Sequence, residues 1–66
     1  MNKLKYYRKI SELSQPALAE KSGVKLYTIQ KLETGANNLN EAHMRNGYLL
    51  AKALGINMED LLDLED

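Results

Sequence analysis

Apolar residues recur at helical spacing along most of the chain, and glycines divide them into short segments. Leu4, Tyr7 and Ile10 predict a first helix from about Lys3 to Glu12, with these three side chains facing inward. Val and Ile are few and never alternate with polar residues, so strands are not expected. The pattern predicts an all-α protein of five short helices joined by short turns.

The second and third helices have clear end signals. Ser14 is a suitable N-cap for the second helix, Pro16 lies in its first turn, and Gly23 ends it. The third helix follows Val24 and ends at Thr34-Gly35. The apolar residues of this pair expected in the core are Leu18, Ala19, Val24, Ile29 and Leu32. Two such helices joined by a glycine turn predict a helix-turn-helix pattern.

A fourth helix is expected from a cap at Asn40 to Leu54, with Gly55 closing it. Its apolar residues at helical spacing are Met44, Tyr48, Ala51 and Leu54. Gly47 inside this helix should cost roughly 1 kcal/mol relative to Ala, which indicates a bend or a close helix contact there.

A fifth helix is expected after a cap at Asn57. Glu59 and Asp60 then lie in its positive first turn, where acidic residues are favourable. The leucines that follow are expected mostly in the core, with one of them available for a dimer contact: Leu61, Leu62 and Leu64.

Length and composition favour one intracellular domain. A chain of 66 residues has room for a single domain, residues 1–66, and for no separate ligand-sensing domain. The absence of Cys fits a reducing cytoplasm and excludes disulfides and thiolate zinc sites. The longest apolar run, Tyr48 to Ala51, is far shorter than the roughly 20 residues that span a bilayer. We therefore expect a cytoplasmic protein without membrane contact.

The zero net charge conceals a segregation of charge along the chain. Residues 1–57 contain all nine basic residues and four acids, a net charge of +5, whereas the last nine residues contain five acids and no base. The acidic end is at least as well explained by solubility as by any specific role. Because the body of the chain is basic, overall neutrality does not exclude a polyanionic partner.

A helical wheel of the third helix separates a core side from a polar side. Leu32 and Glu33 fall within about 60° of Ile29. The opposite side contains Tyr27, Gln30, Lys31 and Thr34, which can donate hydrogen bonds to phosphates or base edges and include no acid. An ordinary exposed helix face has a similar composition, so the wheel alone favours a solvent-exposed face over a DNA-binding one.

The segment LSQPALAEKSGVKLYTIQKLETG resembles the helix-turn-helix of the phage repressor and Cro family, also called the xenobiotic-response-element type. The matching residues are Leu13-Ser14-Gln15, Leu18-Ala19, Gly23-Val24, Ile29, Leu32-Glu33 and Gly35, and "LAKALGI" and "EDLL" match the family's fourth and fifth helices. The resemblance covers nearly the whole chain. It implies a compact five-helix lambda-repressor-like DNA-binding domain.

The resemblance also implies roles for individual residues. The tip of the recognition helix and the next turn are the base-reading candidates: Lys25, Leu26, Tyr27, Thr28 and Lys31. Gln15 is implied to bind a DNA phosphate from the start of the second helix, and Asn37 and Asn38 fall in a loop that often touches the DNA backbone. Gln30 and Thr34 are further phosphate candidates from the wheel. Arg8 and Glu33 are implied to form a structural ion pair, which the inward position of Glu33 supports.

Three positions depart from the family pattern. Lys25 stands where a Ser, Thr or Asp cap is usual, which indicates either phosphate or guanine contact or only a general positive charge. Leu26 and Tyr27 replace polar residues, so they either pack on thymine methyl groups or form a protein-binding patch. The segment from Gly35 to Ala51 is about three residues longer than usual.

The sequence thus predicts a sequence-specific, DNA-binding transcriptional regulator, expected to be a repressor and a homodimer on double-stranded DNA. The alternative is a protein-interaction module that retains the fold without binding DNA. No nucleophile–base pair or set of metal ligands points to an enzyme, a cofactor or a small-molecule ligand, and His43 has no second ligand nearby in the sequence.

Overall fold

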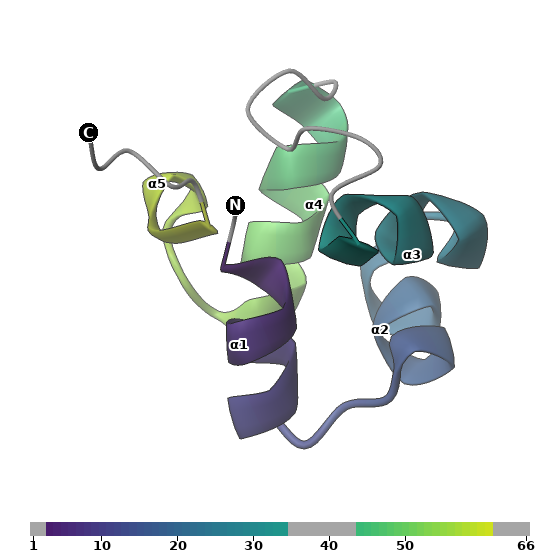
Figure 1. Ribbon diagram of the computed structural model, residues 1–66. Helices are drawn as coiled ribbons and strands as arrows, with labels where there is room; N and C mark the ends of the chain where they lie inside the picture. Colours follow the sequence, from purple (N-terminus) through teal and green to yellow (C-terminus); the bar gives the residue numbers. More distant parts are fainter. Residues whose placement is uncertain (1–2, 35–43, 62–66) are drawn as a thin grey trace.

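The computed structural model describes residues 3–34 and 44–61, which form five helices (Figure 1). They are α1 (Leu4–Ile10), α2 (Gln15–Ser22), α3 (Leu26–Thr34), α4 (Met44–Leu54) and α5 (Met58–Leu61). No strand occurs among the described residues. The Cα radius of gyration, 10.3 Å, is close to the value of about 11 Å for a folded domain of this length. The predicted compact, all-α, five-helix fold is confirmed.

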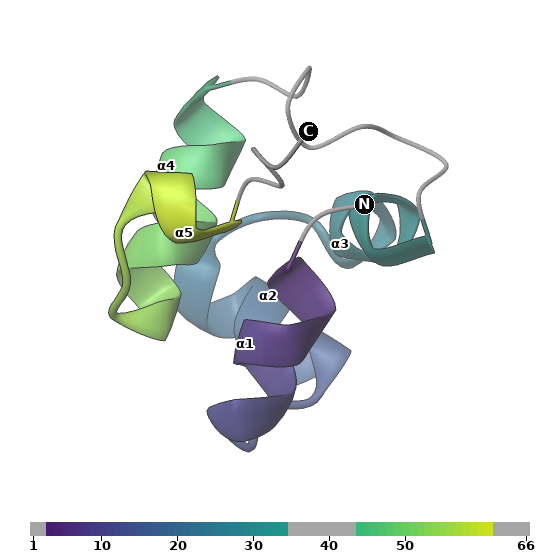
Figure 2. The same cartoon turned by 60° about the vertical axis from the view of Figure 1, so that its left-hand side comes forward.

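One apolar core receives side chains from every helix. Its buried members are Leu4, Leu18, Val24, Ile29, Leu32, Leu50, Ala51, Ala53 and Leu61. Helix α4 packs against both α2 and α5, and α3 packs against α1 and α2. The backbone N–H of Lys3 donates to the carbonyl oxygen of Leu61 at 3.0 Å, so α5 lies beside the start of α1 (Figure 2). The short helices are therefore held mainly by packing against one another.

The ends of α2 follow the local chemistry expected from the sequence. The Ser14 hydroxyl oxygen accepts a hydrogen bond from the backbone N–H of Ala17 at 3.1 Å, which caps the helix. Gly23 ends it with φ +82°, a left-handed conformation that suits glycine. The N–H of Val24 then donates to the Ser22 hydroxyl at 3.1 Å. These bonds fix the turn that leads into α3.

Helix α1 is shorter than predicted, and the inward placement of Ile10 was wrong. The helix ends at Ile10, whose side chain is 59% exposed. Ile10 lies about 120° around the helix from buried Leu4, whereas Arg8 lies within about 40° of it and takes the inward position. Glu12 terminates the helix at φ +59°, and the N–H of Leu13 donates to the carbonyl of Arg8 at 3.2 Å. This arrangement is typical of a helix end that usually contains glycine, so a glutamate at this position is no stop signal.

Only half of the apolar set predicted in α4 faces the core: Ala51 is buried and Leu54 packs against it, whereas Met44 and Tyr48 do not. Met44 is 78% exposed and Tyr48 is also exposed, whereas Gly47, Leu50 and Ala51 are buried. The close contact expected at Gly47 is present: a Cβ built there would lie 2.9 Å from Cε of Met58 in α5. Because α5 packs directly over Gly47, the face next to this glycine is covered, and Met44 and Tyr48 point outward.

Helix α5 begins directly after Asn57, as predicted, and contains Glu59 and Asp60 in its first turn. The carboxylate of Asp60 accepts a hydrogen bond from the Asn57 N–H at 3.1 Å. Leu61 is fully buried, as expected. The predictions for Asn40, Leu62 and Leu64 lie outside the described residues.

Candidate nucleic-acid interface

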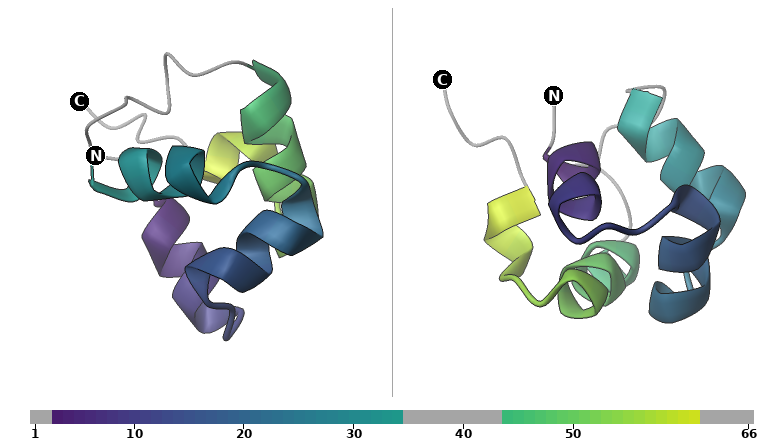
Figure 3. Two further views of the ribbon diagram at one scale, coloured as in Figure 1. Left: turned by 90° about the vertical axis from the view of Figure 1, so that its right-hand side faces the viewer. Right: turned by 90° about the horizontal axis from the view of Figure 1, so that it is seen from below.

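Helices α2 and α3 run in different directions and are joined by the turn at Gly23 and Val24 (Figure 3). Ile29 and Leu32 of α3 are buried, and they fix which side of the helix faces outward. The outward side contains Tyr27, Gln30 and Thr34, all exposed, and Lys31, which is partly buried. The wheel therefore predicted the orientation of α3 correctly.

Two residues one turn apart on α3 form a single unit. The Lys31 ammonium nitrogen lies 5.1 Å from the centre of the Tyr27 ring, within the range of a cation–π interaction. The Tyr27 side chain remains 66% exposed. The ring of Tyr27 thus holds the positive charge of Lys31 over the outward surface of α3. Together the two side chains present a hydrogen-bond donor and an aromatic face there.

The tip of α3 mixes exposed and covered residues. Lys25 is exposed just before the first turn, and its side chain has no oxygen that could cap the helix. Leu26 and Thr28 are only partly exposed, so less of Leu26 than of Tyr27 is available for contact. The Thr34 hydroxyl, at the other end of the helix, donates to the carbonyl of Lys31 at 3.1 Å. Asn37 and Asn38 lie outside the described residues.

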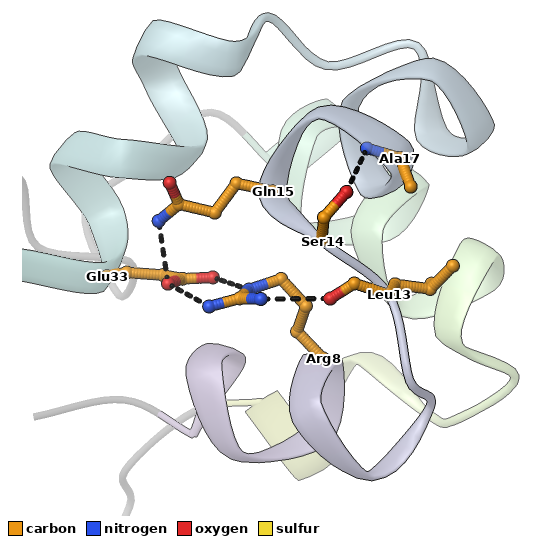
Figure 4. A network of polar contacts seen from close by, with 6 residues as sticks. All are labelled: Arg8, Leu13, Ser14, Gln15, Ala17 and Glu33. Carbon is orange, nitrogen blue, oxygen red and sulfur yellow. Dashed lines mark hydrogen bonds and ion pairs between the residues drawn. The ribbon is translucent and has the colours of Figure 1, made fainter.

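A polar cluster locks α3 to α1 and to the start of α2 (Figure 4). Arg8 binds Glu33 through two hydrogen bonds, from Nε to Oε2 at 2.5 Å and from the second terminal nitrogen to Oε1 at 3.0 Å. Its remaining terminal nitrogen donates to the carbonyl of Leu13 at 2.9 Å. The Gln15 amide nitrogen also donates to Glu33 Oε1, at 3.0 Å. The expected Arg8–Glu33 ion pair is present, and Gln15 joins it.

The ion pair is almost entirely shielded from water: the side chains of Arg8 and Glu33 are 11% and 3% exposed. Burial by itself raises the pKa of the Glu33 carboxyl, but the hydrogen bonds from Arg8 and Gln15 and the charges of Arg8 and Lys5 outweigh it and lower that pKa. The hydrogen bond to Glu33 is the main cause that raises the pKa of Arg8. Both groups are therefore held in their charged forms.

The lowered pKa of Glu33 predicts a loss of stability in acid. Above about pH 4.5, the ordinary value for this group, Glu33 is ionised in both the folded and the unfolded chain, and the ion pair contributes fully. As the pH falls below that value, the unfolded chain takes up the proton first, so the free energy of unfolding decreases. Urea unfolding between pH 7 and pH 3 measures this decrease. NMR titration of the Glu33 side-chain carbon checks its source, and a midpoint at or above 4.5 would contradict the prediction.

The hydrogen bond between Gln15 and Glu33 was not found from the sequence, which assigned Gln15 only to a phosphate. Its single available signal was the position of Gln15 at the start of α2, directly after the Ser14 cap. Among residues 3–34 and 44–61, no group of His, Cys, Asp and Glu is arranged to hold a metal ion. In the same residues, no helix is long and apolar enough to cross a membrane.

These features define the class of the protein. Two short helices joined by a glycine turn, the second with a polar outward face that lacks acidic side chains, are a helix-turn-helix. A family model described as helix-turn-helix matches residues 4–61. The chain belongs to this Cro/C1-type helix-turn-helix family, the xenobiotic-response-element family of DNA-binding transcriptional regulators.

A curated relative supports the same assignment. It is an uncharacterized helix-turn-helix-type transcriptional regulator of Methanocaldococcus jannaschii, 38% identical over 65 residues, which cover 98% of this chain and 94% of the relative. No solved structure matches the chain significantly.

Proposed function

We propose that the protein is a sequence-specific transcriptional regulator that inserts α3 into the major groove of double-stranded DNA. The observation that carries this proposal is the outward face of α3. It presents the amide of Gln30 and the ammonium of Lys31, while Glu33, the one acid of the helix, is turned inward to Arg8. A face of donors without a carboxylate suits a negatively charged groove whose base edges are rich in acceptors.

The residues of α3 and α2 take different roles in this proposal. The base-reading residues are Lys25, Leu26, Tyr27, Thr28 and Lys31. The phosphate-binding residues are Gln15, Gln30 and Thr34, together with Asn37 and Asn38 of the segment that follows α3 in the sequence. One amide hydrogen of Gln15 is used by Glu33, and the second can donate to a phosphate oxygen. Glu33 would thereby fix the direction in which Gln15 meets the DNA.

We further propose that the protein acts as a homodimeric repressor. A single domain of this size buries little DNA surface, and two domains on paired half-sites gain affinity together. Such a dimer would act by occupying its operator. A protein that binds a bacterial chromosome or a phage genome works in the cytoplasm, so we propose that location for this regulator.

A salt series tests DNA binding directly. Fluorescence anisotropy with a random-sequence duplex should show binding that weakens steeply between 50 and 200 mM KCl, with a log–log slope of about −0.9 for each phosphate neutralised. Selection from random duplexes should then yield a preferred sequence. An absence of binding at low salt would refute the proposal. It would favour a protein-binding role, for which the exposed ring of Tyr27 would be the first surface to test.

A further inference from the structure

Two tyrosine–lysine pairs of the same kind lie on different helices. In α3 the Lys31 ammonium nitrogen lies 5.1 Å from the centre of the Tyr27 ring, and in α4 the Lys52 ammonium nitrogen lies 5.9 Å from the centre of the Tyr48 ring. In each pair the lysine follows the tyrosine by four residues, which places both side chains on the same face of the helix. The first pair belongs to the helix-turn-helix and the second does not. The pair on α4 is therefore a matched control for any role of the pair on α3.

The pair on α3 is held in position and still leaves surface free for contact. Lys31 is partly buried, whereas the Tyr27 side chain remains 66% exposed although the ammonium lies over its ring. A lysine side chain on its own samples many rotamers and loses that freedom when it binds a ligand. Contact with the ring restricts the ammonium beforehand, so less freedom is lost on binding. Tyr27 thus acts as a positioning residue for Lys31 and offers apolar surface of its own.

The two side chains match two different groups on base edges of the major groove. The C5-methyl group of thymine takes apolar contacts, which an exposed ring can supply, and guanine N7 and O6 accept hydrogen bonds from a lysine. The distance of 5.1 Å between ring centre and ammonium lies between one and two base-pair spacings of about 3.4 Å. The pair can therefore meet neighbouring base pairs. Glu33 is held by Arg8, so its carboxylate does not compete with a guanine for the Lys31 ammonium.

We propose that Tyr27 and Lys31 read a thymine and a guanine in adjacent base pairs as one unit. The Tyr27 ring packs against the thymine methyl group, and the Lys31 ammonium, held by the same ring, donates to N7 and O6 of the guanine. The inference rests on the proposed insertion of α3 into the major groove, and it names the bases that this part of the helix prefers. It also assigns the exposed ring of Tyr27 to DNA rather than to a protein partner.

Base analogues in the operator test the two contacts separately. An operator is first selected from random duplexes with the wild-type protein, and it should contain a thymine next to a guanine. Deoxyuridine in place of this thymine lacks only the methyl group and should weaken binding about fourfold, the loss expected when one methyl group is no longer removed from water. 7-Deazaguanine in place of the guanine lacks N7 and should weaken binding at least about fivefold. Anisotropy titrations at one salt concentration measure both losses.

Variants of the protein show whether both contacts depend on one ring. Tyr27→Ala should abolish the loss caused by deoxyuridine and reduce the loss caused by 7-deazaguanine, because Lys31 is no longer held in position. Tyr27→Phe keeps the ring and should retain both losses. Tyr48→Ala disrupts the matching pair on α4 and should retain both as well. Both tyrosine side chains are exposed, so the variants should fold, which circular dichroism checks.

Each outcome separates this inference from the proposed function. The inference is overturned, and the proposed function stands, if the selected operator has no thymine next to a guanine or if deoxyuridine at that thymine leaves binding unchanged. The same holds if Tyr27→Ala leaves the 7-deazaguanine loss unchanged, or if Tyr48→Ala has the effect of Tyr27→Ala. If Tyr27→Phe behaves as Tyr27→Ala, the hydroxyl group and not the ring makes the contact, which also overturns the inference. If the wild-type protein binds no DNA, the inference and the proposed function both fail.

Discussion

Replacement of Arg8 by Met is expected to destabilise the protein by about 3–5 kcal/mol. The substitution leaves the carboxylate of Glu33, 3% exposed, with Gln15 as its one remaining side-chain donor among the described residues. It also removes the hydrogen bond to the carbonyl of Leu13. A domain of this size has a total stability of roughly 3–10 kcal/mol, so the variant should lose a large part of its free energy of unfolding. Urea unfolding followed by circular dichroism measures the loss.

The control for this prediction removes both charges together. The double variant Arg8→Met with Glu33→Met leaves no buried charge, and it should recover most of the stability lost in the single variant. Arg8→Lys retains the charge but cannot form the two parallel hydrogen bonds, so its stability should fall between wild type and Arg8→Met. If the double variant were as unstable as the sum of the two single variants, the ion pair would not be the cause of the loss.

The parts of the fold that sequence predicts well are those decided by local chemistry. Ser14 and Gly23 mark the ends of α2 because a hydroxyl can cap a helix and glycine can adopt the left-handed conformation that ends one. The outward face of α3 follows from the spacing of Ile29 and Leu32. None of these features requires knowledge of another helix.

The features that sequence analysis misplaced depend on contacts between helices. Met44 and Tyr48 have the spacing of a buried face, but the contact of Gly47 with Met58 decides which side of α4 is covered. Glu12 ends α1 in a conformation usual for glycine, so the residue type carries no stop signal. In α4 tertiary packing thus overrides a local pattern, whereas α1 ends at a residue type that does not usually end a helix.

The candidate interface likewise contains some features that local sequence predicts and others that depend on the packing of helices. The outward positions of Tyr27 and Lys31 and the inward position of Glu33 follow from helical period alone. The hydrogen bond from Gln15 to Glu33 joins residues 18 positions apart in the chain. A single sequence contains no periodicity that reports such a pair, which becomes visible only once α2 and α3 are packed.

Replacement of Lys31 by Ala is expected to relax the preference for one or two base pairs, with a loss of about 1–3 kcal/mol of discrimination. The Lys31 ammonium is held over the ring of Tyr27 on the outward face of α3, and guanine O6 and N7 are its best acceptors in a major groove. Binding to a selected operator should therefore weaken more than binding to a random duplex. Anisotropy titrations with the operator and with single-base variants of it measure the difference.

Two further variants show whether Lys31 reads bases or only adds positive charge. Lys21→Ala removes an exposed lysine from α2 and should leave the order of preferred sequences unchanged. Gln15→Ala should weaken binding to every sequence alike, because a phosphate contact carries no base information. If Lys31→Ala weakened operator and random duplex by the same factor, as expected for Gln15→Ala, Lys31 would be a phosphate contact. Sequence reading would then depend on the tip of α3, at Lys25, Tyr27 and Thr28.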